Sequence, residues 1–365
     1  MQTGTGTATG AFVGREHDLR ELDGVLREGE RGRGRVVLLS GEAGIGKTRL
    51  SEEAGRIATD RGFRVTRASC FLDEGAPPFW LWIQILRGLV AKEGVDVEAM
   101  FGPRRAEVAR LVPELARPGD PEFVMDASAR FRLLDALAGS LRAFSARQPL
   151  LVILDDLHWA DAASLQMLRH CAREVRDAAI VIIGAYRDTE VSGALGDVVA
   201  DLRRVTDGIV LTGLTPEDVQ LLIAPWTSDT PRLVRVVTQE TGGNPFFVKE
   251  VVRLLAAQGR LEDDIDLSTL PILPQTVRDV IDHHLSRLSQ PCHDILELAA
   301  VLGHEFAVTI LSEVSDVPPD RLLDLIGEAI SARVLTEVPD AATVRFSHAL
   351  VREAVYEGSD SCCRQ

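Results

Sequence analysis

Short apolar runs and longer amphipathic segments alternate along the chain from residue 12 to residue 212. Residues 35–40 and 150–154 are dominated by apolar side chains, which is typical of strands buried on both faces of a parallel sheet. Further strand patterns lie at 63–68, 179–186 and 209–211. Apolar residues return at helical spacing in 17–28, 48–54, 80–90, 130–146 and 161–177. Strands that alternate with helices predict an α/β fold, with a parallel sheet covered by helices on both faces.

The pattern becomes mainly helical beyond this region. Thr215 is a good N-cap, Pro216 suits the first helical turn, and Asp218 completes an acidic capping box. Helical patterns continue to about Gln258 and are interrupted at 242–245. The acidic stretch 260–274, which carries two prolines, is typical of a linker.

The last part of the chain combines helices with a pair of strands. Helical patterns occupy 277–288, 293–302 and 321–332, and strand patterns follow at 334–338 and 343–346. Helices followed by a hairpin predict a winged-helix module. The predicted organisation is therefore a disordered tail (1–11), an α/β domain (12–212), a helical domain (213–262), a linker (263–274), a winged-helix domain (275–357) and a second tail (358–365).

Length, charge and cysteine content narrow the class of protein. The 365 residues exceed one ordinary domain, so two or three are expected. A formal net charge of −15 argues against a broad nucleic-acid-binding face. The 5 cysteines are scattered and odd in number, which favours a reducing cytoplasm over a disulfide framework. No apolar run approaches membrane-spanning length, so we expect a cytoplasmic protein with no membrane partner.

A phosphate-binding pattern lies between the first strand and its helix. Residues 41–48 read Gly-Glu-Ala-Gly-Ile-Gly-Lys-Thr and fit G-x-x-x-x-G-K-[ST]. The glycines Gly41, Gly44 and Gly46 let successive backbone N–H groups converge beside a helix N-terminus. Lys47 is expected to reach the β- and γ-phosphates from an exposed position in a cleft, and Thr48 to offer its hydroxyl to Mg²⁺. The alternative is a glycine-rich turn that binds nothing, but the full match between a strand and a helix favours a nucleotide site.

Two acids follow the strand at 150–154. Asp155 is expected to hold Mg²⁺, directly or through water, and Asp156 to orient the attacking water or act as a base. The alternative is an ordinary strand that ends in polar turn residues. Arg187 follows the next strand, and a guanidinium at that edge of the sheet is predicted to reach the γ-phosphate. The alternative for Arg187 is a solvated side chain paired with Asp188.

Six motifs stand together in one order and carry a resemblance to a known family. They are Phe12-Val13-Gly14-Arg15-Glu16, Gly41–Thr48, Leu154–Asp161, Ala185–Glu190, Thr241–Phe247 and Arg345–Glu353. Together they resemble the STAND class of P-loop ATPases, and within it the ATPase region of the large LuxR-type (LAL) transcriptional regulators of actinobacteria. The resemblance covers about residues 11–357.

The resemblance implies further nucleotide contacts. Val13 and Arg15 would lie near the adenine or ribose, and Arg49 is counted with the phosphate loop. Pro245 would pack on the base as part of a G-x-P motif, and His348 would contact the β-phosphate of ADP. The residues alone leave plainer alternatives open, since Pro245 suits a helix start and His348 an ordinary core or surface histidine.

The function that follows is a slow, regulatory ATPase that acts as a switch. ADP would hold the P-loop, helical and winged-helix domains closed, and ATP would favour an open form that self-associates into a homo-oligomer. The resemblance further implies a transcriptional regulator with an inducer that the sequence does not reveal. It would contact DNA through a helix-turn-helix domain absent from this chain, so no direct DNA contact is expected here and the chain is expected to be a fragment or truncated product. The alternatives are a DNA-binding protein acting through its winged helix and an AAA-like remodelling or loader ATPase.

Overall fold

The computed structural model describes residues 12–70, 77–91, 96–120, 128–191, 193–204, 207–227, 231–259, 261, 281–282, 285–332, 334–338, 343–347, 351–352 and 354–356. The chain divides into two compact units. The sheet unit comprises residues 15–42 and 46–211, and the C-terminal unit comprises residues 212–365 together with 1–14 and 43–45. Within the described residues, no helix has the length and apolar character needed to cross a bilayer.

The sheet unit is built on five parallel strands in the order β2-β3-β4-β1-β5. Their bounds are β1 Arg35–Gly41, β2 Arg64–Ser69, β3 Leu150–Asp155, β4 Ile180–Arg187 and β5 Asp207–Val210. The three inner strands are almost wholly buried, whereas β2, at one edge of the sheet, mixes buried residues with partly and fully exposed ones. All five strands were predicted from the sequence within a few residues, and the parallel α/β fold is confirmed.

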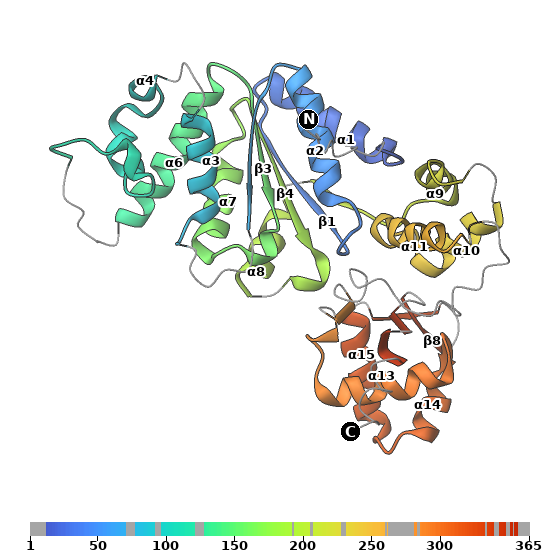
Figure 1. Ribbon diagram of the computed structural model, residues 1–365. Helices are drawn as coiled ribbons and strands as arrows, with labels where there is room; N and C mark the ends of the chain where they lie inside the picture. Colours follow the sequence, from blue (N-terminus) through green and yellow to red (C-terminus); the bar gives the residue numbers. More distant parts are fainter. Residues whose placement is uncertain are drawn as a thin grey trace, which may run out of the picture. The chain divides into compact units, whose positions relative to one another are not determined.

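Helices form a layer on each face of this sheet (Figure 1). One layer contains α1 Glu16–Glu30 and α2 Lys47–Asp60, and the other contains α3 Trp80–Val90, α6 Ala129–Ser145, α7 Ala162–Glu174 and α8 Gly193–Leu202. The packing explains Gly29 in α1, because a β-carbon there would lie 2.6 Å from Val181 Cγ2 of β4. Short helical turns lie between α3 and α6: α4 Val97–Phe101, η1 Gly102–Arg104, α5 Arg105–Val108 and η2 Pro113–Leu115.

Helix α6 shows where the sequence pattern misleads. Leu134, Leu137 and Leu141 are buried in the core, as their spacing predicts. Phe131 belongs to the same pattern but is 64% exposed, and its ring contacts His170 of α7 edge-on. Ala129 in the same first turn is buried, so Phe131 alone departs from the pattern, and helical spacing overstates the length of the buried stripe.

The C-terminal unit begins with three helices. Helix α9 spans Pro216–Ile223, α10 spans Pro231–Thr241 and α11 spans Pro245–Ala257, and the three pack against one another. The predicted capping box is present, because the Thr215 hydroxyl accepts from the Asp218 N–H and the Asp218 carboxylate accepts from the Thr215 N–H. The predicted helix break at 242–245 is also confirmed.

The rest of this unit holds helices beside a second, small sheet. The helices are α13 Gln290–Leu302, α14 Val308–Val314 and α15 Pro319–Ser331, and the strands are β6 Glu305–Ala307, β7 Leu335–Glu337 and β8 Thr343–Phe346. The strands pair antiparallel in the order β6-β8-β7, so the predicted hairpin gains a third strand that the sequence analysis missed. The tails, the linker 263–274 and half of the predicted helix 277–288 lie outside the described residues.

Candidate functional site

The phosphate-binding pattern forms the turn between β1 and α2. Strand β1 ends at Gly41 and α2 begins at Lys47, with Gly46 as its N-cap. Gly46 has a φ of 105° and Gly44 a φ of 75°, backbone values that side-chain-bearing residues rarely adopt. The glycines thus permit the loop that brings the positive end of the α2 dipole to the end of the sheet.

Lys47 is buried instead of lying exposed in a cleft, which corrects the sequence expectation. The residue is 8% exposed, and Nζ donates to the carbonyls of Gly41 at 2.8 Å and Glu42 at 2.7 Å. Burial, and after it the charge of Arg187, lowers the pKa of Lys47 to about 8. The carboxylates of Asp188, Asp156 and Asp155 act in the opposite direction. The ammonium is therefore held by its own loop and lies within electrostatic range of the predicted site residues on β3 and β4.

Asp155 and Asp156 lie at the carboxyl end of β3, as predicted. Asp155 is 4% exposed, and its Oδ1 accepts a hydrogen bond from the N–H of Asp156 at 3.1 Å. Asp156 has a φ of 55°, a left-handed conformation that carries strain in a residue with a side chain. Burial, followed by the charge of Asp155, raises the pKa of Asp156, while Arg187 and Lys47 partly offset the rise.

Arg187 ends β4 directly beside the phosphate loop. Its Cα is the register partner of Gly41 on β1. The guanidinium donates to Glu190 at 2.9 Å and lies 5.0 Å from the centre of the Trp159 ring. Glu190 thus takes the place of Asp188, the partner considered in the sequence analysis. This arrangement brings Arg187 to the edge of the sheet that carries Lys47.

A magnesium ion would find oxygen donors here. Thr48 is an exposed residue in the first turn of α2, and the Asp155 carboxylate ends β3. One hydroxyl and one carboxylate, completed by water and phosphate oxygens, form the kind of donor set that Mg²⁺ prefers. These residues therefore fit the metal that the sequence motif implies, without a cage of three or more ligating side chains in the described part of the chain.

Asp161 is a structural residue whose role the sequence analysis missed. Its carboxylate accepts from the N–H of Phe79 at 3.0 Å, the N–H of Ser164 at 2.9 Å and the hydroxyl of Ser164 at 2.6 Å. It therefore caps α7 and ties the start of α3 to it. The Asp-x-x-Ser spacing was a readable N-cap signal, but the link to Phe79 depends on tertiary structure.

Asn244 is a second missed residue, and it lies within the C-terminal unit together with residues 43–45. It is 0% exposed and donates through Nδ2 to the carbonyl of Ala43 at 3.0 Å. Its Oδ1 caps α11 by accepting from the Phe246 N–H. A β-carbon on Gly44 would lie 2.6 Å from Phe246 Cβ, so the tip of the phosphate loop packs closely here. An Asn before a helix-start proline signals the cap but not the contact with Ala43.

The other residues expected near the nucleotide occupy varied positions. Pro245 is the first residue of α11, as its helix-start alternative predicts. Val13 packs against the apolar core of the C-terminal unit, and Arg15 lies 3.8 Å from Asp18. Arg49 pairs with Glu52 on α2 at 3.3 Å. His348 lies outside the described residues.

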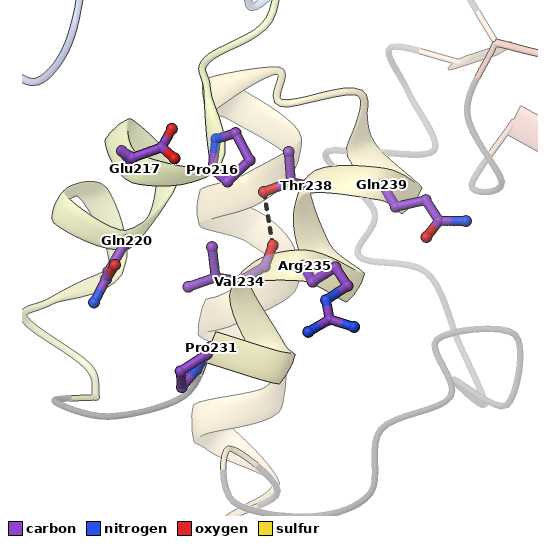
Figure 2. Close-up of a pocket in the computed structure, with 8 residues that line it drawn as sticks. All are labelled: Pro216, Glu217, Gln220, Pro231, Val234, Arg235, Thr238 and Gln239. Carbon is purple, nitrogen blue, oxygen red and sulfur yellow. Dashed lines mark hydrogen bonds between the residues drawn. The ribbon is translucent and has the colours of Figure 1, made fainter.

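A separate hollow of about 480 Å³ lies in the C-terminal unit between α9 and α10 (Figure 2). Its wall includes Glu217, Gln220, Arg235 and Gln239. Within α10, the Thr238 hydroxyl donates a hydrogen bond to the Val234 carbonyl. None of the site residues predicted in the described ranges lines this hollow. It is therefore distinct from the phosphate loop.

Comparisons with known proteins agree with this geometry. The model of the AAA ATPase domain family matches residues 11–183. An uncharacterized protein of Rhizobium meliloti is 24% identical over 96% of this chain, and the chain spans 36% of that relative's length. Hybrid signal transduction histidine kinase G of Dictyostelium discoideum is 26% identical over 45% of the chain, which corresponds to 5% of the kinase.

Solved structures resemble this chain at low sequence identity. The ORC2 protein of Aeropyrum pernix, in ADPNP–ADP complexes, superposes with a TM-score of 0.57 at 18% identity, over 95% of both chains. A STAND protein of Pyrococcus horikoshii with a tetratricopeptide repeat sensor gives a TM-score of 0.40 at 17% identity, over 95% of this chain and 42% of that one. The family match over residues 11–183, together with the phosphate loop and the acids that end β3, supports a P-loop ATPase domain in this part of the chain.

Proposed function

We propose that this chain is an ATP- and ADP-binding switch that hydrolyses ATP slowly with Mg²⁺. The observation that supports this most directly is the placement of Lys47, Arg187 and the two acids that end β3 at the carboxyl ends of three neighbouring parallel strands. Catalysis of phosphoryl transfer consists mainly of positioning and charge stabilisation. It requires the groups found here: two cations to bind phosphate, one carboxylate to bind a metal ion and one carboxylate to orient water.

Each group has a distinct role in this proposal. Lys47 would exchange its two carbonyl acceptors for the β- and γ-phosphates, and Arg187 would bind the γ-phosphate. Thr48 and Asp155 would hold Mg²⁺, which neutralises phosphate charge, and Asp156 would orient the attacking water. Gly41, Gly44, Gly46 and Arg49 would complete the phosphate cradle. Turnover would be slow without an arginine from a neighbouring subunit, which elsewhere contributes about 10³–10⁵-fold.

The switch itself extends to the C-terminal unit. We assign residues 213–262 to a helical domain and residues 275–357 to a winged-helix domain, with Pro245 and His348 as ADP contacts and Val13 and Arg15 near the adenosine. Moving such a switch from mostly closed to mostly open needs about 5.5 kcal/mol of differential binding. A few charge-assisted hydrogen bonds at roughly 1.5–3 kcal/mol each are sufficient. The protein would then act in the cytoplasm as the nucleotide-controlled, self-associating part of a LAL-type transcriptional regulator.

The first test is direct nucleotide binding. The nucleotide released when the purified protein is denatured should be ADP or ATP, and calorimetry should show binding of both, with Mg²⁺ strengthening ATP binding. Well-folded protein that produces no heat with either nucleotide would refute the proposal.

A second test separates the switch from its alternatives. ATP turnover and duplex-DNA binding are measured on the same preparation, together with the mass of the particle in ATP and in ADP. A switch predicts slow turnover, no salt-sensitive DNA binding and a larger particle in ATP. Rapid turnover would favour a remodelling motor, and salt-sensitive DNA binding would favour a DNA reader.

Equal off-rates of ADP from His348→Ala and the parent would remove His348 from the site.

A further inference from the structure

A continuous line of polar side chains runs from Arg187 to Asp156 through two residues that the proposed mechanism does not use. Arg187 Nη1 donates to Glu190 Oε1 at 2.9 Å. The other oxygen of Glu190 lies 3.6 Å from His158 Nε2, and the same nitrogen lies 3.7 Å from Asp156 Oδ1. His158 therefore stands between the carboxylate that binds Arg187 and the carboxylate expected to orient water.

The surroundings hold the His158 ring in this position. Its side chain is 0% exposed, and its ring centre lies 4.6 Å from that of Trp159, beside which the Arg187 guanidinium also packs. The left-handed backbone at Asp156 begins the short turn η3, Leu157–Trp159, that contains His158. Strain of this kind persists only where the surrounding structure enforces it. The imidazole can therefore move over only a short range.

The two distances are almost equal, and both exceed the usual length of an N–H···O hydrogen bond. A shift of roughly half an ångström toward either oxygen would form a bond with that carboxylate and weaken the contact with the other. One N–H cannot bond both acids well at the same time. The position of His158 thus depends on which of the two carboxylates has fewer other hydrogen-bond donors.

We propose that His158 is a positioning residue that transmits the engagement of Arg187 to Asp156. With Arg187 bound to Glu190, His158 is shared between the two acids. When a γ-phosphate draws Arg187 away, Glu190 loses the Arg187 hydrogen bond and attracts Nε2, which frees Asp156 Oδ1 to accept a hydrogen bond from water. The second oxygen, Asp156 Oδ2, keeps its contact of 3.5 Å with the Ser69 hydroxyl, so the carboxylate does not lose its orientation. The inference rests on the proposed function for its nucleotide step, but the contact network exists without nucleotide.

The first experiment is independent of nucleotide. The ring Cε1–Hε1 resonance of His158, assigned by its absence from His158→Leu, is followed by NMR in the nucleotide-free protein. It should move in Glu190→Gln and in Asp156→Asn, and stay in place in Glu174→Gln, a control on α7 whose carboxylate pairs with Arg142. An unmoved resonance in Glu190→Gln overturns the inference, whether or not the protein binds ATP.

The second experiment measures hydrolysis and binding separately. His158→Leu should lower kcat about 10-fold, a part of the roughly 10²–10⁴-fold that a positioned acid–base group contributes, while the Kd for ATP changes less than about twofold. His158→Gln, which keeps an N–H near Nε2, should recover most of kcat. His170→Leu is the matched control, since His170 contacts Phe131 away from the site. Unchanged kcat in His158→Leu, or an equal loss in His170→Leu, contradicts the assignment.

The third experiment tests the direction of the relay. The non-hydrolysable triphosphate ADPNP should shift the His158 resonance, and ADP should not. Equal shifts with both would overturn the relay while leaving nucleotide binding intact. If the His158 resonance moves in Glu190→Gln as expected but the parent protein gives no heat with nucleotide, the proposed function is refuted and the positioning of His158 remains supported.

Discussion

The strand ends at one edge of the sheet are built in two different ways. After β1, the chain forms its phosphate loop from backbone, with glycines at positive φ and a lysine held by carbonyls of its own loop. After β3 and β4, the chain forms a network of side chains that joins Arg187, Glu190, His158 and Asp156. A backbone site needs only a short local sequence, whereas a side-chain network needs several strands to be brought together.

The largest effect is expected at the backbone site from Lys47→Ala. Loss of the ammonium should weaken ATP and ADP binding at least 100-fold, because each charged hydrogen bond contributes roughly 1.5–3 kcal/mol. The fold should survive, since the lost carbonyl contacts are offset by removal of a buried charge. Calorimetry and thermal unfolding measure both, with Arg56→Ala on the exposed side of α2 as the control. Binding within a few-fold of the parent would contradict the role of Lys47.

At the carboxyl end of β3, Asp155→Asn should act mainly on hydrolysis. The amide preserves the shape of the side chain but weakens the metal ligand, so turnover should fall roughly 10²-fold, as for other single electrostatic groups in active sites. Turnover is measured over a range of Mg²⁺ concentrations, and excess Mg²⁺ should recover part of it. Turnover equal to that of the parent at every Mg²⁺ concentration would remove Asp155 from the metal site.

A smaller effect, on stability instead of chemistry, is expected from Asp161→Ala. The substitution removes an N-cap and leaves the Phe79 N–H without its acceptor, which should cost about 2 kcal/mol of unfolding free energy. Urea unfolding measures the loss, and the Kd for ATP should remain within about twofold. A loss of binding without a loss of stability would move Asp161 into the nucleotide site.

The smallest effects are expected from two glycine substitutions, one at a glycine with positive φ and one at a glycine inside a helix. Gly46→Ala forces a side chain into a φ of 105° and should cost about 1–2 kcal/mol. Gly24→Ala, within α1 and with open space around its Cα, should instead stabilise the protein by about 0.5–1 kcal/mol. Urea unfolding of both variants compares them directly. Equal signs would show that the positive φ of Gly46 is not a constraint.

Much of the sheet unit could be predicted from local sequence. The five strands, their flanking helices and the phosphate loop each depend on a few consecutive residues, and each appears near its expected position. Asp155 and Asp156 were also placed correctly, because the carboxyl ends of parallel strands meet at one edge. Strand β6 was missed because three residues carry too little periodicity to identify a strand.

The sequence by itself determined which segments become strands, where the backbone curls around a phosphate and which acids end a strand, because these outcomes follow from spacing and from the conformational freedom of glycine. Only the tertiary structure decided the strand order β2-β3-β4-β1-β5, the burial of Lys47 and the choice of Glu190 over Asp188 as the partner of Arg187. The same holds for the placement of His158 between two carboxylates. These depend on which side chains from distant segments meet in a low-dielectric interior, and no local pattern encodes that meeting.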